Sequence, residues 1–233
     1  MILQTKKLTK KYGKSTVVDS LSISVPKGAI YGVLGPNGSG KTTTLGMILN
    51  VINPTSGTIS LFSEKANDSN SRKKIGAILE TPNFYPYMNA IQNLSLVAKI
   101  KDIIPEEIPR KIEDKLKLVT LYEERYKPFG KFSLGMKQRL SIASSLLNDP
   151  ELLILDEPTN GLDPVGISDI RNIINTVSKN GTTVVIASHL LDEIQKVCTH
   201  LMIIKKGVEK FQGEMKEFSE GGNLEQKFLE IIS

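Results

Sequence analysis

Alternation of apolar and polar residues marks the first part of the chain as β-structure. Leu21, Ile23 and Val25 lie two positions apart, and the pattern breaks at Pro26 and Gly28. A period of two is typical of a strand with one buried face, and Pro and Gly favour turns. The pattern therefore predicts a pair of strands joined by a turn, at a β-rich edge of the domain.

Three short apolar runs farther along predict buried strands. The first, residues 29–34, is followed by a glycine-rich loop and by helical spacing of apolar residues over 45–49. The second, residues 152–155, ends on acidic residues, and the third, residues 182–187, ends at a Ser-His pair before another helix. Strands that alternate with helices favour an α/β fold with a parallel sheet.

The segment between the first and second runs carries a helical pattern. Over residues 90–148, apolar positions such as Ile112, Leu116 and Val119 recur with helical spacing, and Pro105 stands where a helix can begin. We interpret this segment as an inserted helical subdomain. The chain is thus predicted to be one domain, 1–233, with a core and β subdomain at about 1–80 and 150–215, a helical subdomain at about 81–149 and a helical tail at about 216–233.

Composition excludes some classes of protein but does not identify a binding partner. The chain has 233 residues, 39% of them hydrophobic and 24% charged, and its apolar stretches fall short of the roughly 20 residues that cross a bilayer. Its start lacks the apolar run of a secretory signal, so we expect a cytoplasmic protein. With Cys198 as its one Cys and with two His, it cannot build a usual zinc site, and Cys198 is predicted to be an inert packed thiol. A net charge of +5 suits nucleic acid or anionic lipid equally.

The glycine-rich loop fits the pattern G-x-x-x-x-G-K-[ST] and lies between a predicted strand and a predicted helix, so we favour a phosphate-binding loop over a plain turn. In such a loop backbone N–H groups and the helix N-terminus, with about half a positive charge, face the phosphates. Lys41 is expected to reach the β and γ oxygens, and Thr42 to give its hydroxyl to Mg²⁺. The predicted nucleotide contacts are Gly35, Pro36, Asn37, Gly38, Ser39, Gly40, Lys41, Thr42 and Thr43.

Two carboxylates, Asp156 and Glu157, follow the second buried strand. In open α/β sheets ligands gather at the carboxyl ends of the strands. We expect Asp156 to hold Mg²⁺, directly or through water, and Glu157 to polarise the water that attacks the γ-phosphate. Alone, such a pair would be a solvated strand end. Its pairing with a phosphate loop favours the catalytic interpretation.

Residues 132–139, with the sequence FSLGMKQR, resemble the LSGGQ signature of ABC-transporter ATPases with its basic, Gln-containing extension. Ser133 and Gly135 match that signature, whereas Leu134 replaces its first glycine and Met136 its Gln. The resemblance implies that Ser133 and Gly135 contact the γ-phosphate bound by the opposite subunit, at the start of a helix. As an isolated string the segment would be an ordinary helix cap.

The resemblance covers nearly the whole chain and implies roles for three more residues. Tyr12 would stack on adenine, a contact of about 1–3 kcal/mol by analogy with single-strand binders. Residues 160–163 are similar to the D-loop that crosses a dimer interface, with Asp163 as the communicating carboxylate, and His189 matches the switch histidine that hydrogen-bonds the γ-phosphate. Without the resemblance, Tyr12 would be interpreted as a packed strand residue, residues 160–163 as a turn and His189 as a helix-start or surface residue.

One departure from the family is informative. Where most members carry the Gln of the Q-loop, this chain has Glu80, a carboxylate that can bind Mg²⁺ or water but only accepts hydrogen bonds. Through Glu80 and the FSLGMKQRL segment, the chain resembles the bacterial subfamily that confers lantibiotic self-immunity and bacitracin resistance. A drifted Q-loop without function is the competing interpretation. The aromatic residues of 84–87 are expected either to touch a membrane partner or to form the core of the subdomain.

The resemblance implies a P-loop ATPase of the ABC type, with a RecA-like parallel core, an antiparallel β subdomain and a helical subdomain. Two such subunits, as a homodimer or heterodimer, would bind ATP and Mg²⁺ between them and drive separate permeases at the inner face of the membrane, to expel a peptide antibiotic.

Three alternatives stay open. The transporter could carry another substrate; the chain could be a soluble ABC ATPase acting on nucleic acid or ribosomes, although it lacks tandem domains and a zinc module; or it could be a non-hydrolysing regulatory subunit, although Glu157 and His189 are both present.

Overall fold

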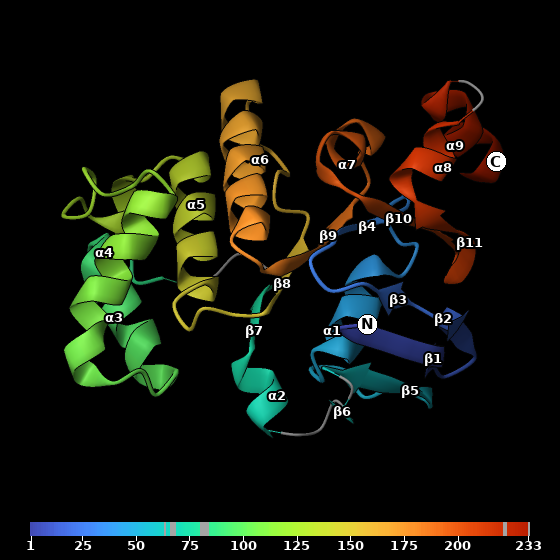
Figure 1. Cartoon of the computed structure of the whole chain (residues 1–233), viewed down its shortest axis with the longest axis horizontal. Helices are drawn as coiled ribbons and strands as arrows, with labels where there is room; N and C mark the ends of the chain where they lie inside the picture. Colours follow the sequence, from blue (N-terminus) through green and yellow to red (C-terminus); the bar gives the residue numbers. More distant parts are fainter. Residues whose placement is uncertain (63, 66–68, 80–83, 221–222, 233) are drawn as a thin grey trace.

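The computed structural model describes residues 1–62, 64–65, 69–79, 84–220 and 223–232. In this part of the chain two β-sheets pack with helices, most of which lie at the left and along the top of the view in Figure 1. None of the described helices is long and apolar enough to cross a bilayer. Besides two 3₁₀ turns, Pro105–Glu107 and Phe129–Lys131, the helices are α1 (Lys41–Ile48), α2 (Ser69–Lys73), α3 (Ala90–Ile100), α4 (Ile108–Leu118), α5 (Leu134–Ser145), α6 (Pro164–Lys179), α7 (Leu191–Val197), α8 (Met215–Ser219) and α9 (Leu224–Ile232).

The first sheet is antiparallel and has the strand order β2-β1-β5-β6, with β3 paired to β1. It joins the amino-terminal hairpin to a segment some fifty residues farther along, since Leu3 pairs with Leu61. The apolar residues of its inner face, among them Leu8 and Leu21, are buried. Its strands are β1 (Leu3–Tyr12), β2 (Ser15–Leu21), β3 (Ser24–Val25), β5 (Ser56–Leu61) and β6 (Glu64–Lys65).

The second sheet has the order β11-β10-β4-β9-β8-β7, and all its neighbouring strands are parallel except β10 and β11. Every residue of β4 and β9 is buried, as a strand covered on both faces requires. This is the predicted α/β arrangement. The strands are β4 (Ile30–Leu34), β7 (Ile75–Ile78), β8 (Leu152–Asp156), β9 (Thr183–Ser188), β10 (His200–Lys205) and β11 (Val208–Glu214).

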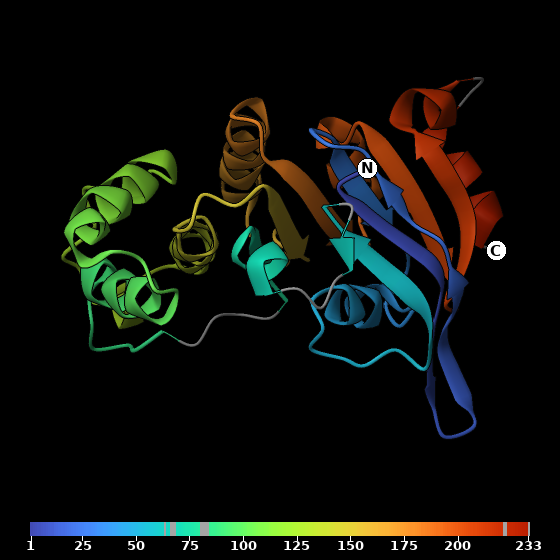
Figure 2. The same ribbon diagram turned by 60° about the horizontal axis from the view of Figure 1, so that its bottom comes forward.

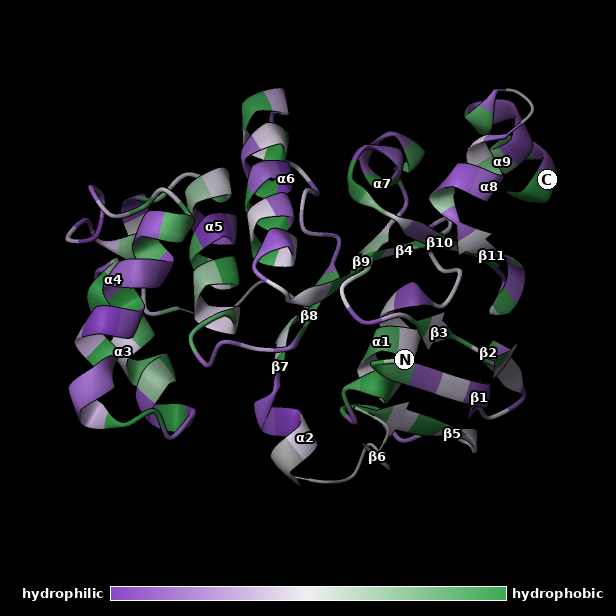
Figure 3. Cartoon of the chain, in the orientation of Figure 1, coloured by the Kyte–Doolittle hydropathy of each residue, from purple (hydrophilic) through white to green (hydrophobic). Residues whose placement is uncertain are grey.

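Two hydrophobic cores cover the two faces of the second sheet. On one face, α1 lies between the sheets, and Leu45 and Ile48 pack with Val33 and Ile154 (Figure 2). On the other face, residues of α5, α6 and α7 pack against β8 and β9. Figure 3 shows apolar residues on α1 and hydrophilic ones on the outside of α4. The strands that end near the glycine-rich loop are therefore held from both sides.

The predicted helical segment does form helices α3, α4 and α5, which pack against one another. Ile112, Leu116 and Val119 are all buried there, as their spacing predicted. Helix α3 begins with a capping box, in which Asn89 and Gln92 each accept a hydrogen bond from the other's backbone N–H.

The predicted strand pair around Pro26 and Gly28 was wrong in its pairing. The two strands that flank this turn belong to different sheets: β3 pairs with β1, whereas β4 lies between β10 and β9. The turn is therefore a crossing between sheets rather than a hairpin. Period-two spacing identifies a strand but not its partner, because pairing depends on distant segments.

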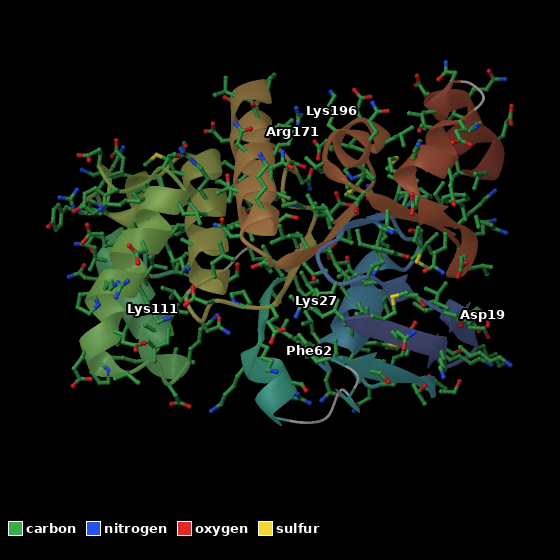
Figure 4. All side chains as sticks on the ribbon, viewed as in Figure 1. Asp19, Lys27, Phe62, Lys111, Arg171 and Lys196 are labelled. Atoms are coloured by element: carbon green, nitrogen blue, oxygen red, sulfur yellow. The ribbon has the colours of Figure 1, made fainter. Side chains whose placement is uncertain are left out.

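A partly buried lysine ties the helical segment to the second sheet. Lys101, which follows α3, donates to Oδ1 of Asn148 at 2.8 Å, and Asn148 in turn donates to the carbonyl of Lys73 just before β7. These groups line a hollow shared with Lys111, which is labelled in Figure 4. Burial lowers the pKa of Lys101 to about 8, because the ammonium loses water on folding.

Lys101 should therefore make the stability depend on pH. Because its folded pKa of about 8 lies below the ordinary 10.5, the unfolded chain binds more protons between these values. As the pH rises over that range, the parent should gain roughly 2–3 kcal/mol relative to Lys101→Met. Urea unfolding of both proteins at pH 7.5 and 10 measures this difference, and a difference that stays constant would contradict it.

Candidate functional site

The glycine-rich loop joins β4 to α1 and is shaped by glycines that no larger residue could replace. A Cβ on Gly35 would lie 2.3 Å from the carbonyl oxygen of Ile204, and Gly40 has a φ of 103° just before α1. Ser39 and Gly40 are buried, whereas Pro36, Asn37 and Gly38 are exposed. The loop thus keeps its central backbone open to a ligand while its ends are fixed.

Lys41, the first residue of α1, is buried with only 5% of its surface exposed. Its Nζ donates to the carbonyl oxygens of Gly35 at 2.8 Å and Pro36 at 3.3 Å. It also lies 3.2 Å from Oε1 of Glu157, an ion pair that is not aligned as a hydrogen bond. The ammonium therefore sits inside the loop, where a phosphate group would meet it.

Asp156 ends β8 directly beside the start of α1. Its Oδ2 accepts a hydrogen bond of 2.6 Å from the hydroxyl of Thr42, while its Oδ1 is buried without a hydrogen-bond partner among the described residues. Burial raises the pKa of Asp156 above its ordinary range, and the neighbouring Glu157 adds to the increase, against the opposing effects of Thr42 and Lys41. Thr43, in the same first turn, is half-buried.

This pair of oxygens fits a Mg²⁺ ion that a nucleotide would complete. A free carboxylate oxygen next to a threonine hydroxyl offers the hard oxygen ligands that Mg²⁺ takes. Across the described residues, no group of three or more His, Cys, Asp or Glu side chains could hold a metal by itself. The remaining ligands would therefore have to come from phosphates and water.

Glu157 and His189 come together although 32 positions separate them. His189 Nδ1 lies 2.8 Å from Glu157 Oε2, at the carboxyl ends of the adjacent strands β9 and β8. Glu157 has a φ of 47°, an uncommon value for a residue with a side chain, and its N–H donates to the carbonyl of Ala187. Strained backbone of this kind gathers at functional sites.

The turn between β10 and β11 supports the loop, a role that the sequence patterns did not predict. Gly207 N–H donates to the carbonyl of Ser39 at 2.9 Å, and the Gly207 carbonyl accepts from Asp19 of β2, labelled in Figure 4. A Cβ on Gly207 would lie 2.3 Å from the Val17 carbonyl oxygen. The Lys-Gly pair of a strand turn is a weak signal, because only the assembled sheets bring it to the loop.

Ser133, Gly135 and Asp163 line a second hollow, of about 390 Å³, away from the loop. Ser133 caps α5 by accepting from Met136 N–H at 3.2 Å, and Asp163 caps α6 by accepting from Gly166 N–H at 2.7 Å. In the single chain their hydrogen bonds are thus to their own helices. The structure places these three predicted residues around one hollow, which Lys41 does not line.

Tyr12 ends β1 and is 52% exposed, with the Lys10 ammonium 4.8 Å from its ring centroid. The same hairpin reaches the loop at Val17, whose carbonyl oxygen would lie 2.8 Å from a Cβ on Gly40. Tyr12 is therefore on the surface, on the hairpin that contacts the loop through Val17. Glu80, the predicted Q-loop residue, lies outside the described residues.

The aromatic residues of 84–87 were expected either to touch a membrane partner or to form the core of the helical subdomain, and the structure divides them between core and surface. Phe84 is buried against Phe129, whereas Tyr85 and Tyr87 are 51% and 73% exposed and lie 5.7 Å apart. Phe84 therefore belongs to the core of the helical segment. The two tyrosines remain on the surface, where a partner could contact them.

Comparison with known proteins gives consistent matches. The sequence profile of the family described as "ABC transporter" matches residues 18–160. Bacitracin transport ATP-binding protein BcrA of Enterococcus faecalis is 45% identical over 88% of this chain and 67% of its own. Lantibiotic transport ATP-binding protein SrtF of Streptococcus pyogenes is 38% identical over 97% of this chain and 96% of its own.

Among solved structures, the fold is similar to that of the ATP-binding cassette MJ0796, determined as a dimer in a post-hydrolysis state bound to ADP and Pi. The TM-score is 0.80, with 25% identity, over 91% of this chain and 98% of that one.

The raised pKa of Asp156 predicts opposite effects of Asp156→Asn on stability and on function. At neutral pH the variant should resist urea better than the parent, because it removes a carboxylate that folding disfavours. The advantage should vanish as the pH falls below the ordinary pKa of Asp, about 4, where both side chains are neutral. Turnover of ATP should fall about 100-fold or more, because we expect Asp156 to hold the metal ion. A variant that is less stable than the parent at pH 7 would contradict this account.

Proposed function

The chain belongs to the ABC transporter family of ATP-binding subunits, and we propose that it drives separate permease subunits that expel a peptide antibiotic of the lantibiotic or bacitracin type. It binds ATP and is an ATPase. The observation that carries the proposed mechanism is the meeting of Lys41, Thr42, Asp156, Glu157 and His189 at the carboxyl ends of three adjacent strands.

Lys41 is the proposed ligand of the β- and γ-phosphates. Its ammonium already lies among the loop carbonyls, 3.2 Å from Glu157. An incoming phosphate offers it stronger, charge-assisted hydrogen bonds than the carbonyls do. Its attraction to that phosphate weakens its hold on Glu157, so nucleotide binding frees the carboxylate for its next role.

Glu157 is the proposed general base and His189 its positioning partner. Once Lys41 has turned to the phosphates, Glu157 Oε1 can accept a proton from the attacking water, while Oε2 remains beside His189 Nδ1. His189 can also donate to the γ-phosphate through its other ring nitrogen. Thr42 and Asp156 would hold Mg²⁺, which supplies charge neutralisation of the phosphates when bound.

Ser133, Gly135 and Asp163 are proposed to act on the nucleotide of a second copy of this chain. Their hollow contains the N-termini of two helices, α5 and α6, which together favour an anion. Because the hollow lies on a different part of the chain from Lys41, only a head-to-tail dimer brings the two together. The dimeric cassette with a similar fold supports this arrangement.

The permeases are proposed to hold the subunit at the inner face of the membrane and to determine which peptide is expelled. Support comes from the relatives named for bacitracin and lantibiotic transport, and from the exposed Tyr85 and Tyr87 as a contact surface. We assign Glu80, which precedes this surface in the sequence, to coupling between hydrolysis and the permeases.

Glu157→Gln should leave ATP binding intact and slow hydrolysis by about 10²–10⁴-fold, because the water loses its base while the phosphate loop is unchanged. ATP should then trap a dimer, detected by size-exclusion chromatography. Glu151→Gln is the matched control, since Glu151 lies just before β8, in ion pairs with the exposed Lys27 and Lys74. A Glu157→Gln protein that hydrolyses normally, or stays monomeric with ATP, would sink the assignment.

The transport proposal predicts that deletion of the chain sensitises a Gram-positive strain to one or more membrane-acting peptides. Inhibitory concentrations against a panel of lantibiotics and bacitracin, with each variant supplied in trans, provide the measurement. Glu80→Ala should lower protection more than it lowers ATP binding, and Glu80→Gln should be milder because it keeps an oxygen of similar reach. Unchanged sensitivity on deletion refutes the peptide substrate, and equal protection by Glu80→Ala and the parent refutes the coupling role.

A further inference from the structure

The turn that begins α5 and the turn that precedes α6 interlock through one leucine on each side. A Cβ on Gly161 would lie 3.3 Å from Cδ2 of Leu134, and a Cβ on Gly135 would lie 4.0 Å from Cδ2 of Leu162. Leu134 therefore packs onto the bare backbone of Gly161, and Leu162 faces that of Gly135. At 3.3 Å, a Cβ at position 161 would force the side chain of Leu134 to shift by a few tenths of an ångström.

Apolar packing is the direct link between these two turns in the described structure. The hydrogen bonds of Ser133 and Asp163 stay within the first turns of their own helices. The ion pair between Arg139 and Asp169, 3.6 Å apart, joins α5 to α6 farther along. Leu134 is 50% exposed, so it covers Gly161 with one side and leaves the other side free.

We propose that Leu134 is a positioning residue that locks the turn of Ser133 and Gly135 to the turn of Asp163, so that both reach the partner's nucleotide as one unit. This inference rests on the proposed trans-acting roles of these residues. A glycine at position 134 would leave the groove over Gly161 empty. The two turns could then shift independently, and a misplacement of about 1 Å at a reacting centre can cost up to about 100-fold in rate.

The role of Leu134 predicts a loss of turnover without a loss of binding. Leu134→Ala should lower kcat about tenfold, because the turns no longer share one position, and change KM by less than about twofold. ATP affinity of the isolated subunit, measured with a fluorescent ATP analogue, should not change. The melting temperature should change little, because half of the side chain is already exposed.

Two controls separate positioning from packing in general. Leu134→Met keeps the volume of the side chain and should retain at least about half of the parent's kcat. Leu229→Ala shortens a leucine that is equally exposed, at 51%, but lies in α9, and it should leave kcat near that of the parent. Equal kcat for Leu134→Ala and the parent would overturn the proposal, and so would an equal loss in Leu134→Met and Leu134→Ala.

A double-mutant cycle tests whether Leu134 acts through Gly161. Gly161→Ala should lower kcat, because its Cβ crowds Leu134 and its φ of 76° disfavours a side chain. In the Leu134→Ala background the same change should cost less, since the crowded atom is absent. If the two losses simply multiply, Leu134 does not act through this contact.

Ser133→Arg distinguishes failure of this inference from failure of the proposed function. If Ser133→Arg abolishes turnover while Leu134→Ala is unaffected, the trans site stands and the positioning role falls. If Ser133→Arg hydrolyses ATP normally, the trans assignment itself falls, and the positioning role falls with it.

Discussion

Charged side chains come together at the carboxyl ends of β4, β8 and β9. Hydrogen bonds within the part of the chain that the structure describes do not satisfy all of their polar atoms. Lys41 is buried and Asp156 is half-buried, and Asp156 keeps one buried oxygen without a hydrogen-bond partner among the described residues. Such groups cost free energy unless a ligand completes them. We propose that a nucleotide with its metal completes the site, because phosphates replace the loop carbonyls as acceptors for Lys41 and the cation takes the free oxygen of Asp156. Burial thus disfavours the charged form of Asp156, and a bound cation would offset that cost.

The two sheets and their hydrophobic cores hold these charged groups in position. Every residue of β4 and β9 is buried, so the strand ends that carry the loop and Ser188 cannot move apart without exposing apolar surface. The first sheet contributes through Val17 and Asp19, which reach the loop directly and through Gly207. Distant parts of the sequence thus fix the position of a short loop, which explains why the loop can hold an uncommon backbone shape.

Local patterns were enough to predict the three strands that carry the site and the edge at which the site forms. The buried runs predicted β4, β8 and β9, and parallel pairing brings their ends together whatever the details of packing. What local patterns could not give depends on long-range pairing. The partners of β3 and β4, the support from Gly207 and the contact of Leu134 with Gly161 all join segments that lie far apart in the sequence.

The division of one site between two copies of the chain is the central claim of this account. Two inactive variants, Lys41→Ala and Ser133→Arg, test it when they are mixed and allowed to exchange subunits. A mixed dimer has one site that lacks both groups and one that is intact, so hydrolysis should return to roughly a quarter of the parent's rate. If the mixture forms dimers and stays inactive, Lys41 and Ser133 do not serve one nucleotide from opposite subunits, and the account is wrong.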